Sequence, residues 1–205
     1  MDISTLTLID VFPDSFTLIT KATLDSGFTM ASDPLTCSLL RTLAASKPSG
    51  NFLELGTGTG LSTAWILDGM DPISVLTTVD NDPDFLSIAR DHLGSDSRLT
   101  LILQDCGEWL TKNSTKKFDY IFADTWHGKY LMLDVALSML NPGGLYIIDD
   151  MLPQDNWPSG HSEKADSLIS YLSDRDDLYI TKQIWASGII IGVKIAPEII
   201  DSGNV

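Results

Sequence analysis

The sequence predicts an α/β fold in which a mostly parallel sheet of seven strands carries helices on both faces and ends in an antiparallel hairpin. Short, continuously apolar runs alternate with segments of helical pattern, as in parallel sheets covered on both sides. Three glycines at alternate positions follow the first of these runs, in NFLELGTGTG at 51–60. The last two β-rich runs are separated only by 186–188, Ala-Ser-Gly, which is hairpin spacing.

Composition indicates one domain over residues 1–205. Hydrophobic residues make up 43% of the chain, and neither cysteine belongs to a paired ligand spacing. The formal charge of −15 makes nucleic acid an unlikely partner and repels anionic membrane surfaces. The start of the sequence lacks the pattern of a secretory signal and no apolar run approaches a membrane span, so we expect a cytoplasmic protein.

The N-terminal part, 1–46, is expected to form a helical cap over a core at 51–195. Residues 1–30 predict one or two short helices. A better signalled helix follows, because Asp33 can cap its start and Pro34 suits the first helical position. Lys47-Pro48-Ser49-Gly50 ends that helix.

The core is expected to alternate strands and helices. The predicted strands are 52–55, 73–79, 99–103, 118–123, 145–148, 178–185 and 189–195, and the predicted helices are 61–67, 82–93, a short one from Gly107, 130–140 and 162–172. A loop at 151–160 precedes the last helix. Ligands of such sheets bind at the carboxyl ends of the strands.

The glycine turn after the first strand predicts a nucleotide-type site. Gly56, Gly58 and Gly60 permit positive φ and close approach of a ligand to main-chain N–H groups at the start of a helix. The third glycine comes one residue earlier than in the dinucleotide fingerprint. A ligand without a pyrophosphate suits the turn better, with Asp80 at the end of the next strand accepting its ribose hydroxyls.

This acid-G-x-G-x-G motif resembles that of the class I S-adenosylmethionine-dependent methyltransferases, whose fold is Rossmann-like. The resemblance implies S-adenosyl-L-methionine as cofactor. It places the residues of the turn at the methionine end, Ser62 at the carboxylate, Asp80 at the ribose and Asp105 at the adenine. The implied cofactor set in the core is Glu54, Gly56, Thr57, Gly58, Gly60, Ser62, Asp80, Asn81, Asp105, Cys106, Asp124 and Trp126.

Acidic residues also end two later strands. Asp124 follows the strand at 118–123, and Asp149 and Asp150 follow the strand at 145–148. Three converging carboxylates repel one another unless they are protonated or bridged by a cation, and such ligands favour Mg²⁺ or another divalent cation. Alternatively, one or two of them are helix caps or cofactor contacts.

Both acidic stretches resemble the metal-dependent O-methyltransferases, the group of catechol and caffeoyl-coenzyme A O-methyltransferases, over about 30–195. The resemblance makes Asp124, Asp149 and Asp150 metal ligands, although the last ligand of the family is usually Asn. It places Trp126 near the adenine and Met30, in the cap, against the cofactor. His127 takes the position of the catalytic lysine and is the expected base, with Lys129 and His161 as further candidates.

The expected function is therefore transfer of a methyl group to a metal-bound hydroxyl of a small, aromatic, catechol-like acceptor. Apolar residues that could form the acceptor wall are Met151, Leu152, Pro153, Trp157 and Trp185. Two alternatives stay open: a tRNA hydroxyl-uridine methyltransferase and a non-catalytic cofactor-binding protein. A homodimer through the N-terminal segment is also possible.

Overall fold

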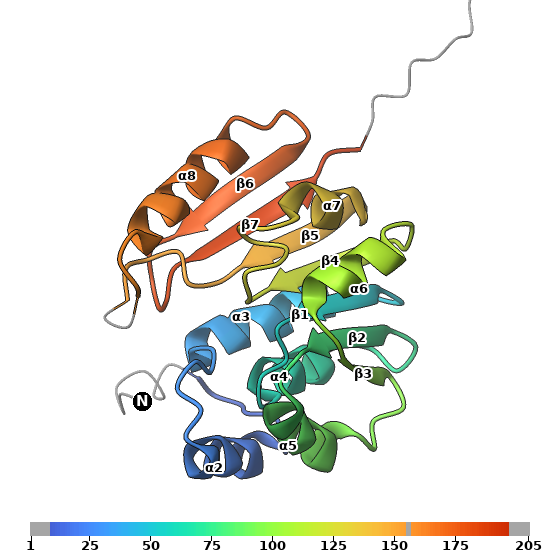
Figure 1. The fold of residues 1–205 in the computed structure, drawn as a ribbon. Helices are drawn as coiled ribbons and strands as arrows, with labels where there is room; N and C mark the ends of the chain where they lie inside the picture. Colours follow the sequence, from blue (N-terminus) through green and yellow to red (C-terminus); the bar gives the residue numbers. More distant parts are fainter. Residues whose placement is uncertain (1–8, 155–156, 197–205) are drawn as a thin grey trace, which may run out of the picture.

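The computed structural model of the chain describes residues 9–154 and 157–196 and contains one seven-stranded sheet (Figure 1). The strand order is β3-β2-β1-β4-β5-β7-β6. Pairs within β3 to β5 are parallel, whereas β7 lies antiparallel to both β5 and β6. This confirms the predicted fold class. The strands are β1 Asn51–Leu55, β2 Val75–Asp80, β3 Leu99–Leu103, β4 Phe118–Ala123, β5 Leu140–Ile148, β6 Leu178–Gln183 and β7 Ile189–Lys194.

Aspartate side chains cap some of the helices by accepting free N–H groups of the first turn. Asp33 accepts a hydrogen bond of 2.7 Å from the Leu35 N–H, and Asp82 accepts bonds from Asp84 and Phe85. The helices are α2 Phe16–Ser26, α3 Pro34–Ala45, α4 Leu61–Gly69, α5 Pro83–Leu93, α6 Cys106–Asn113, α7 Leu133–Ser138 and α8 His161–Ser173. Over the described residues, every helix is too short or too polar to traverse a bilayer.

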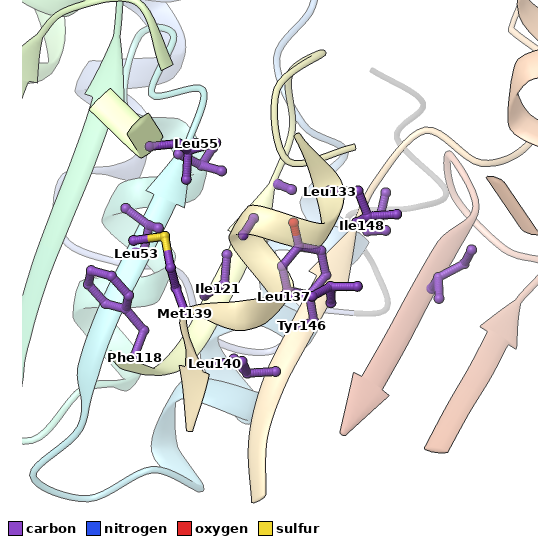
Figure 2. Packing of buried hydrophobic residues seen from close by; sticks show 14 of the residues in the cluster. Leu53, Leu55, Phe118, Ile121, Leu133, Leu137, Met139, Leu140, Tyr146 and Ile148 are labelled. Carbon is purple, nitrogen blue, oxygen red and sulfur yellow. The ribbon is translucent and has the colours of Figure 1, made fainter. Parts of the chain in front are cut away.

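Alternating strand residues divide the core between the two faces of the sheet, as the pleat requires. Leu53, Leu55 and Ile121 point toward α6, α7 and α8, where Leu133 and Leu137 of α7 pack over them (Figure 2). The intervening residues, Phe52, Tyr120 and Phe122, point to the other face, which α2, α3, α4 and α5 cover. Both faces are therefore buried, which explains why the central strands read as continuous apolar runs.

Several predicted boundaries are wrong. The fifth strand begins at Leu140 rather than at residue 145, and the sixth ends at Gln183 rather than at residue 185. The second strand begins at Val75 rather than at residue 73, because Asp71 accepts the N–H groups of Ile73 and Ser74 and holds them in a turn. The helix predicted over 130–140 is only α7, Leu133–Ser138, and it follows a turn in which Trp126 accepts the N–H groups of Tyr130 and Leu131. The chain enters α7 through Met132 in the left-handed conformation, at φ 56°.

The N-terminal cap is docked onto the loops at the carboxyl edge of the sheet. Residues 1–8 of the predicted cap lie outside the described part of the chain. The Thr23 hydroxyl in α2 lies 2.7 Å from that of Thr59, in the glycine turn. Just before α3, the Ser32 hydroxyl donates a hydrogen bond of 2.9 Å to Asp124. The cap thus contacts both loops that flank the centre of the sheet.

Candidate functional site

The candidate site lies where the strand order reverses, between β1 and β4. From β1 the chain proceeds outward to β2 and β3, and then returns to β4 on the other side of β1. The loops after β1 and β4 therefore leave the sheet side by side. They approach closely, since a Cβ atom on Gly56 would lie 2.7 Å from the Asp124 carbonyl oxygen. Open α/β sheets bind their ligands in such crevices.

The glycine turn places main-chain N–H groups and Asp80 together. Gly56, Gly58 and Gly60 all have positive φ, as predicted. The Gly58 N–H donates a hydrogen bond of 2.8 Å to Asp80, whose other carboxylate oxygen accepts from the Asp82 N–H at 2.9 Å. The neighbouring Asn81 side chain is exposed. Asp80 thus lies against the turn at the end of β2, in the position expected for ribose binding.

Phe28 of the cap covers the same turn. A Cβ atom on Gly58 would lie 3.0 Å from the Phe28 ring, which also packs on Phe85 with centroids 4.6 Å apart. Met30, two residues further on, is 68% exposed. Because glycine has no side chain, Gly58 leaves room for the Phe28 ring to pack directly on the turn.

Glu54 lies beneath the glycine turn and accepts hydrogen bonds from the elements on either side of it. Its side chain is fully buried, and its two oxygens accept hydrogen bonds from the hydroxyls of Ser62, Thr63 and Thr78. Burial raises the pKa of Glu54 to about 7, against the lowering effect of these hydrogen bonds. Thr57 joins the group through a 2.6 Å contact with Thr78. The hydroxyls of Ser62 and Thr57 are thus occupied within the protein, and the expected contacts of Glu54, Thr57 and Ser62 with a cofactor stay predictions.

Asp124, Asp149 and Asp150 follow the carboxyl ends of β4 and β5. Asp149 is buried, whereas Asp124 and Asp150 are partly exposed. Burial, followed by the charge of Asp150, raises the pKa of Asp124 to about 6; the charge of Lys129 and the Ser32 hydrogen bond oppose this. Burial and then the charges of Asp124 and Asp150 raise the pKa of Asp149 well above its ordinary value. Mutual repulsion of this kind is what a bound cation would relieve.

Hydrogen bonds from the protein partly satisfy these acids. Ser187, in the hairpin turn, donates to Asp149, and the Asp150 N–H donates to the same carboxylate at 2.8 Å. Asp150 has φ 57°, a strained value for a residue with a side chain. Across 9–154 and 157–196, no three His, Cys, Asp or Glu side chains already converge as ligands of one ion. The donor chemistry of the three acids suits Mg²⁺, and their assignment as its ligands stays a prediction.

His127 and Lys129 point to different parts of the site. The His127 Nδ1 lies 3.9 Å from Asp105, and a Cβ atom on Gly107 would meet its Nε2 at 2.6 Å. The expected base therefore lies beside the start of α6. Lys129 is only 5% exposed, and its charge acts on Asp124. The residue types after β4 do not reveal this difference, because the turn at 126–131 decides the direction of each side chain.

The residues expected near the adenine lie around the start of α6. Asp105 caps that helix by accepting the Glu108 N–H at 2.9 Å. The Cys106 thiol donates to the Val79 carbonyl, and burial raises its pKa to about 12. Trp126, by contrast, packs against Tyr130 and against His161 at the start of α8, and it is 43% exposed. The adenine contacts of these residues stay predictions.

Sequence reasoning missed a cluster of aromatic rings around His161. The Tyr130 hydroxyl lies 3.0 Å from the His161 Nε2, and the imidazole packs against Trp126 and Trp157 with centroids 5.6 and 4.3 Å away. Burial, followed by the charges of Lys129 and Lys164, lowers the pKa of His161. The sequence did contain a hint of this cluster. Trp157 and His161 are four residues apart, and this spacing can bring two side chains together at the start of a helix.

Comparisons with known proteins agree with this geometry. Residues 53–151 match the family model described as "Methyltransferase domain". A curated protein of Mycobacterium avium (strain 104), named as a presumed O-methyltransferase, is 34% identical over 118 residues, which are 54% of this chain and 51% of that protein. The chain thus spans about half the length of the curated relatives it matches.

Solved structures match over nearly the whole chain. An O-methyltransferase from Bacillus cereus, in complex with SAH, has a TM-score of 0.81 and 18% identity, covering 94% of this chain and 96% of that one. The O-methyltransferase TomG from Streptomyces achromogenes, in complex with SAM, has a TM-score of 0.79 and 18% identity, covering 95% and 96%. At this identity the matches show a shared fold. Together with the family model, they confirm the resemblance to class I methyltransferases expected from the sequence.

Proposed function

We propose that this protein is an S-adenosylmethionine-dependent O-methyltransferase that acts on a small, hydroxylated, catechol-like aromatic acceptor with the help of a divalent cation. One observation carries the proposal. The glycine turn with Asp80 and the acids Asp124, Asp149 and Asp150 flank the same switch point, which supports a proposed donor site next to a proposed acceptor site. The match of 53–151 to a methyltransferase domain supports this proposal.

The cofactor site is proposed along the loops after β1, β2 and β3. Main-chain N–H groups at the start of α4 would face the methionine end, Asp80 would accept the ribose hydroxyls, and Asp105 with Cys106 would border the adenine. When bound, S-adenosylmethionine supplies an activated methyl group on a sulfonium. Phe28 covers the turn and reduces access of water to it.

The protein must hold an acceptor oxygen in line with that methyl group and remove its proton. Asp124, Asp149 and Asp150 would hold the cation, which lowers the pKa of a hydroxyl bound to it. His127 is the base that the sequence predicts, but its imidazole lies 3.9 Å from Asp105 at the start of α6, on the adenine side of the proposed cofactor site. To act as base, its side chain would have to turn toward Asp124.

Chelation tests the cation. Purified protein is assayed with S-adenosylmethionine and catechol-like acceptors, with Mg²⁺, with EDTA, and with EDTA followed by excess Mg²⁺. We expect activity to disappear in EDTA, to return with Mg²⁺, and to be lost in Asp149→Asn. The matched control is Asp91→Asn, on the exposed side of α5. Activity that is unchanged by both EDTA and Asp149→Asn would remove the cation from the mechanism.

The two alternative functions have distinct signatures. A tRNA methyltransferase would copurify with RNA and methylate it, and the formal charge of −15 argues against it. A non-catalytic cofactor-binding protein would bind S-adenosylmethionine and transfer its methyl group to none of the acceptors.

A further inference from the structure

A large cavity opens between the segment after β4, which begins at Asp124, and helix α8. Its volume is 810 Å³, within the range of small-molecule sites. The walls are mostly apolar and aromatic: Trp126, Tyr130, Leu131, Met132, Leu168 and Tyr171 line it. Such a cavity accommodates a flat aromatic body larger than one catechol ring.

Lys129 forms part of the wall of this cavity and carries a charge without a direct counterion. The residue is only 5% exposed. Among the described residues, no carboxylate lies within the 4.0 Å of an ion pair and no acceptor receives a hydrogen bond from its ammonium. The ammonium is not itself fully enclosed: it lies 5.3 Å from the centroid of the Tyr130 ring, and a bound anionic group would pair with it directly.

The other charged groups at the cavity leave Lys129 available. Asp134 is paired with Arg175 at 2.7 Å and accepts a bond of 2.7 Å from the Tyr171 hydroxyl. Glu163 lies in the first turn of α8, where the helix dipole favours an acid. Lys164 lies 4.6 Å from the centroid of Trp126, so the rim near Trp126 has a second cation. The Trp126 end of the cavity therefore carries two cations, Lys129 and Lys164, in a strongly acidic protein.

The cavity adjoins the proposed acceptor site, because Trp126, Lys129 and Tyr130 of its wall belong to the loop that begins at Asp124, directly after β4. The charge of Lys129 acts on Asp124, against the raising effect of burial on that acid. Tyr130, also in the wall, is close enough to Asp150 that this charge, after burial, raises the pKa of Tyr130 to about 12. A molecule whose hydroxyl reaches the acids can thus extend into the cavity past Lys129.

We propose that this cavity binds the body of the methyl acceptor, that the acceptor is an aromatic compound bearing a carboxylate, and that Lys129 binds this carboxylate. The inference rests on the proposed function for the identity of the occupant as an acceptor. Trp126 and Tyr130 supply flat faces for the ring. Lys129 is then a specificity-determining residue, which selects acidic over neutral acceptors.

The experiment compares two ligands that differ in charge. Binding of 3,4-dihydroxybenzoate and of its neutral amide is measured by calorimetry, in the presence of S-adenosylhomocysteine. The variant is Lys129→Met, whose unbranched side chain fills a similar volume. The control is Lys116→Met, which removes a lysine that lies over Trp109, near the amino end of β4. Thermal unfolding of both variants is recorded to show that they are folded.

The wild-type protein and Lys116→Met are expected to bind the acid roughly tenfold more tightly than the amide. Lys129→Met is expected to bind the two equally. Equal binding by the wild-type protein, or a preference that survives Lys129→Met, would overturn the inference. Methyl transfer is measured separately: transfer to neutral catechols without preference for the acid contradicts only the inference, whereas charge-selective binding without any transfer contradicts only the proposed function.

Discussion

The Ser32 hydroxyl donates a hydrogen bond of 2.9 Å to Asp124 across 92 positions of sequence. The bond joins the N-terminal cap to a partly buried acid at the end of β4. It also opposes the effects of burial and of Asp150, which together raise the pKa of Asp124 to about 6. The cap therefore influences the ionisation of the site that it covers.

Removing that hydroxyl is expected to shift the pH dependence of activity. In Ser32→Ala, Asp124 loses a hydrogen bond that favours its charged form, so its pKa rises further above about 6. If ionised Asp124 is needed, the acidic limb of the profile of kcat/KM against pH moves upward, by about half a unit to one unit. Ser46→Ala, which removes an exposed hydroxyl at the end of α3, serves as control. If the acidic limb of the profile lies at the same pH in Ser32→Ala and in Ser46→Ala, the ionisation of Asp124 does not control the reaction.

Asp80 and Asp82 offer a matched test of the cofactor site. Both are acids at the β2–α5 junction, but Asp80 binds the Gly58 N–H whereas Asp82 caps α5. Asp80→Asn is expected to weaken S-adenosylmethionine binding at least roughly tenfold, because a charged acceptor for ribose hydroxyls is lost. Asp82→Asn should leave the Kd nearly unchanged, since Asn also caps helices well. Isothermal titration compares the two, and equal losses would contradict the assigned role of Asp80.

Gly56 is expected to tolerate no side chain. It has φ 98°, and a Cβ atom would lie 2.7 Å from the Asp124 carbonyl oxygen. Gly27, by contrast, has φ 75° and nothing within 4 Å of its Cβ position. Gly27→Ala should cost about 1 kcal/mol of unfolding free energy from backbone strain alone, and Gly56→Ala at least about twice that. Urea unfolding measures both, and equal costs would show that the contact between the loops after β1 and β4 contributes nothing.

Glu54 is expected to make stability fall as the pH rises. Its folded pKa, about 7, lies above the ordinary value of 4.5, so the folded state binds more protons between these pH values. The stability that the protonated form contributes is thus present in full below about pH 4.5 and is lost as pH rises through 7. Glu54→Gln should remove about 3 kcal/mol of the difference in unfolding free energy between pH 5 and pH 8. Urea titrations at both pH values measure it, and an unchanged difference would contradict this account.

The regular part of the fold was predictable because local chemistry and tertiary packing agree there. Asp33-Pro34 and Asp82-Pro83 mark the starts of helices that the structure shows, and the apolar runs become the strands of a sheet buried on both faces. The helix predicted over 130–140 is shorter in the structure. The backbone between Trp126 and Leu131 forms a turn, whose hydrogen bonds compete with those of a helix. Sequence pattern alone does not distinguish these outcomes.

The site was predictable as a set of strand ends but not as a set of side-chain directions. Asp80, Asp124 and Asp149 lie at one edge of the sheet, since the carboxyl ends of parallel strands share an edge. That His127 turns toward Asp105 while Lys129 is buried near Asp124 depends on the turn after β4. The packing of Tyr130 against His161 depends on where α8 docks, 31 positions away in sequence.

The most direct test of the central claim is to follow a labelled methyl group. Protein is incubated with S-adenosylmethionine carrying ¹³C in the methyl group, Mg²⁺ and a dihydroxylated aromatic acceptor, and the product is identified by nuclear magnetic resonance. We predict a labelled methoxy carbon on the acceptor and a stoichiometric yield of S-adenosylhomocysteine. Tight binding of the cofactor with no labelled methoxy signal from any hydroxylated acceptor would contradict the account.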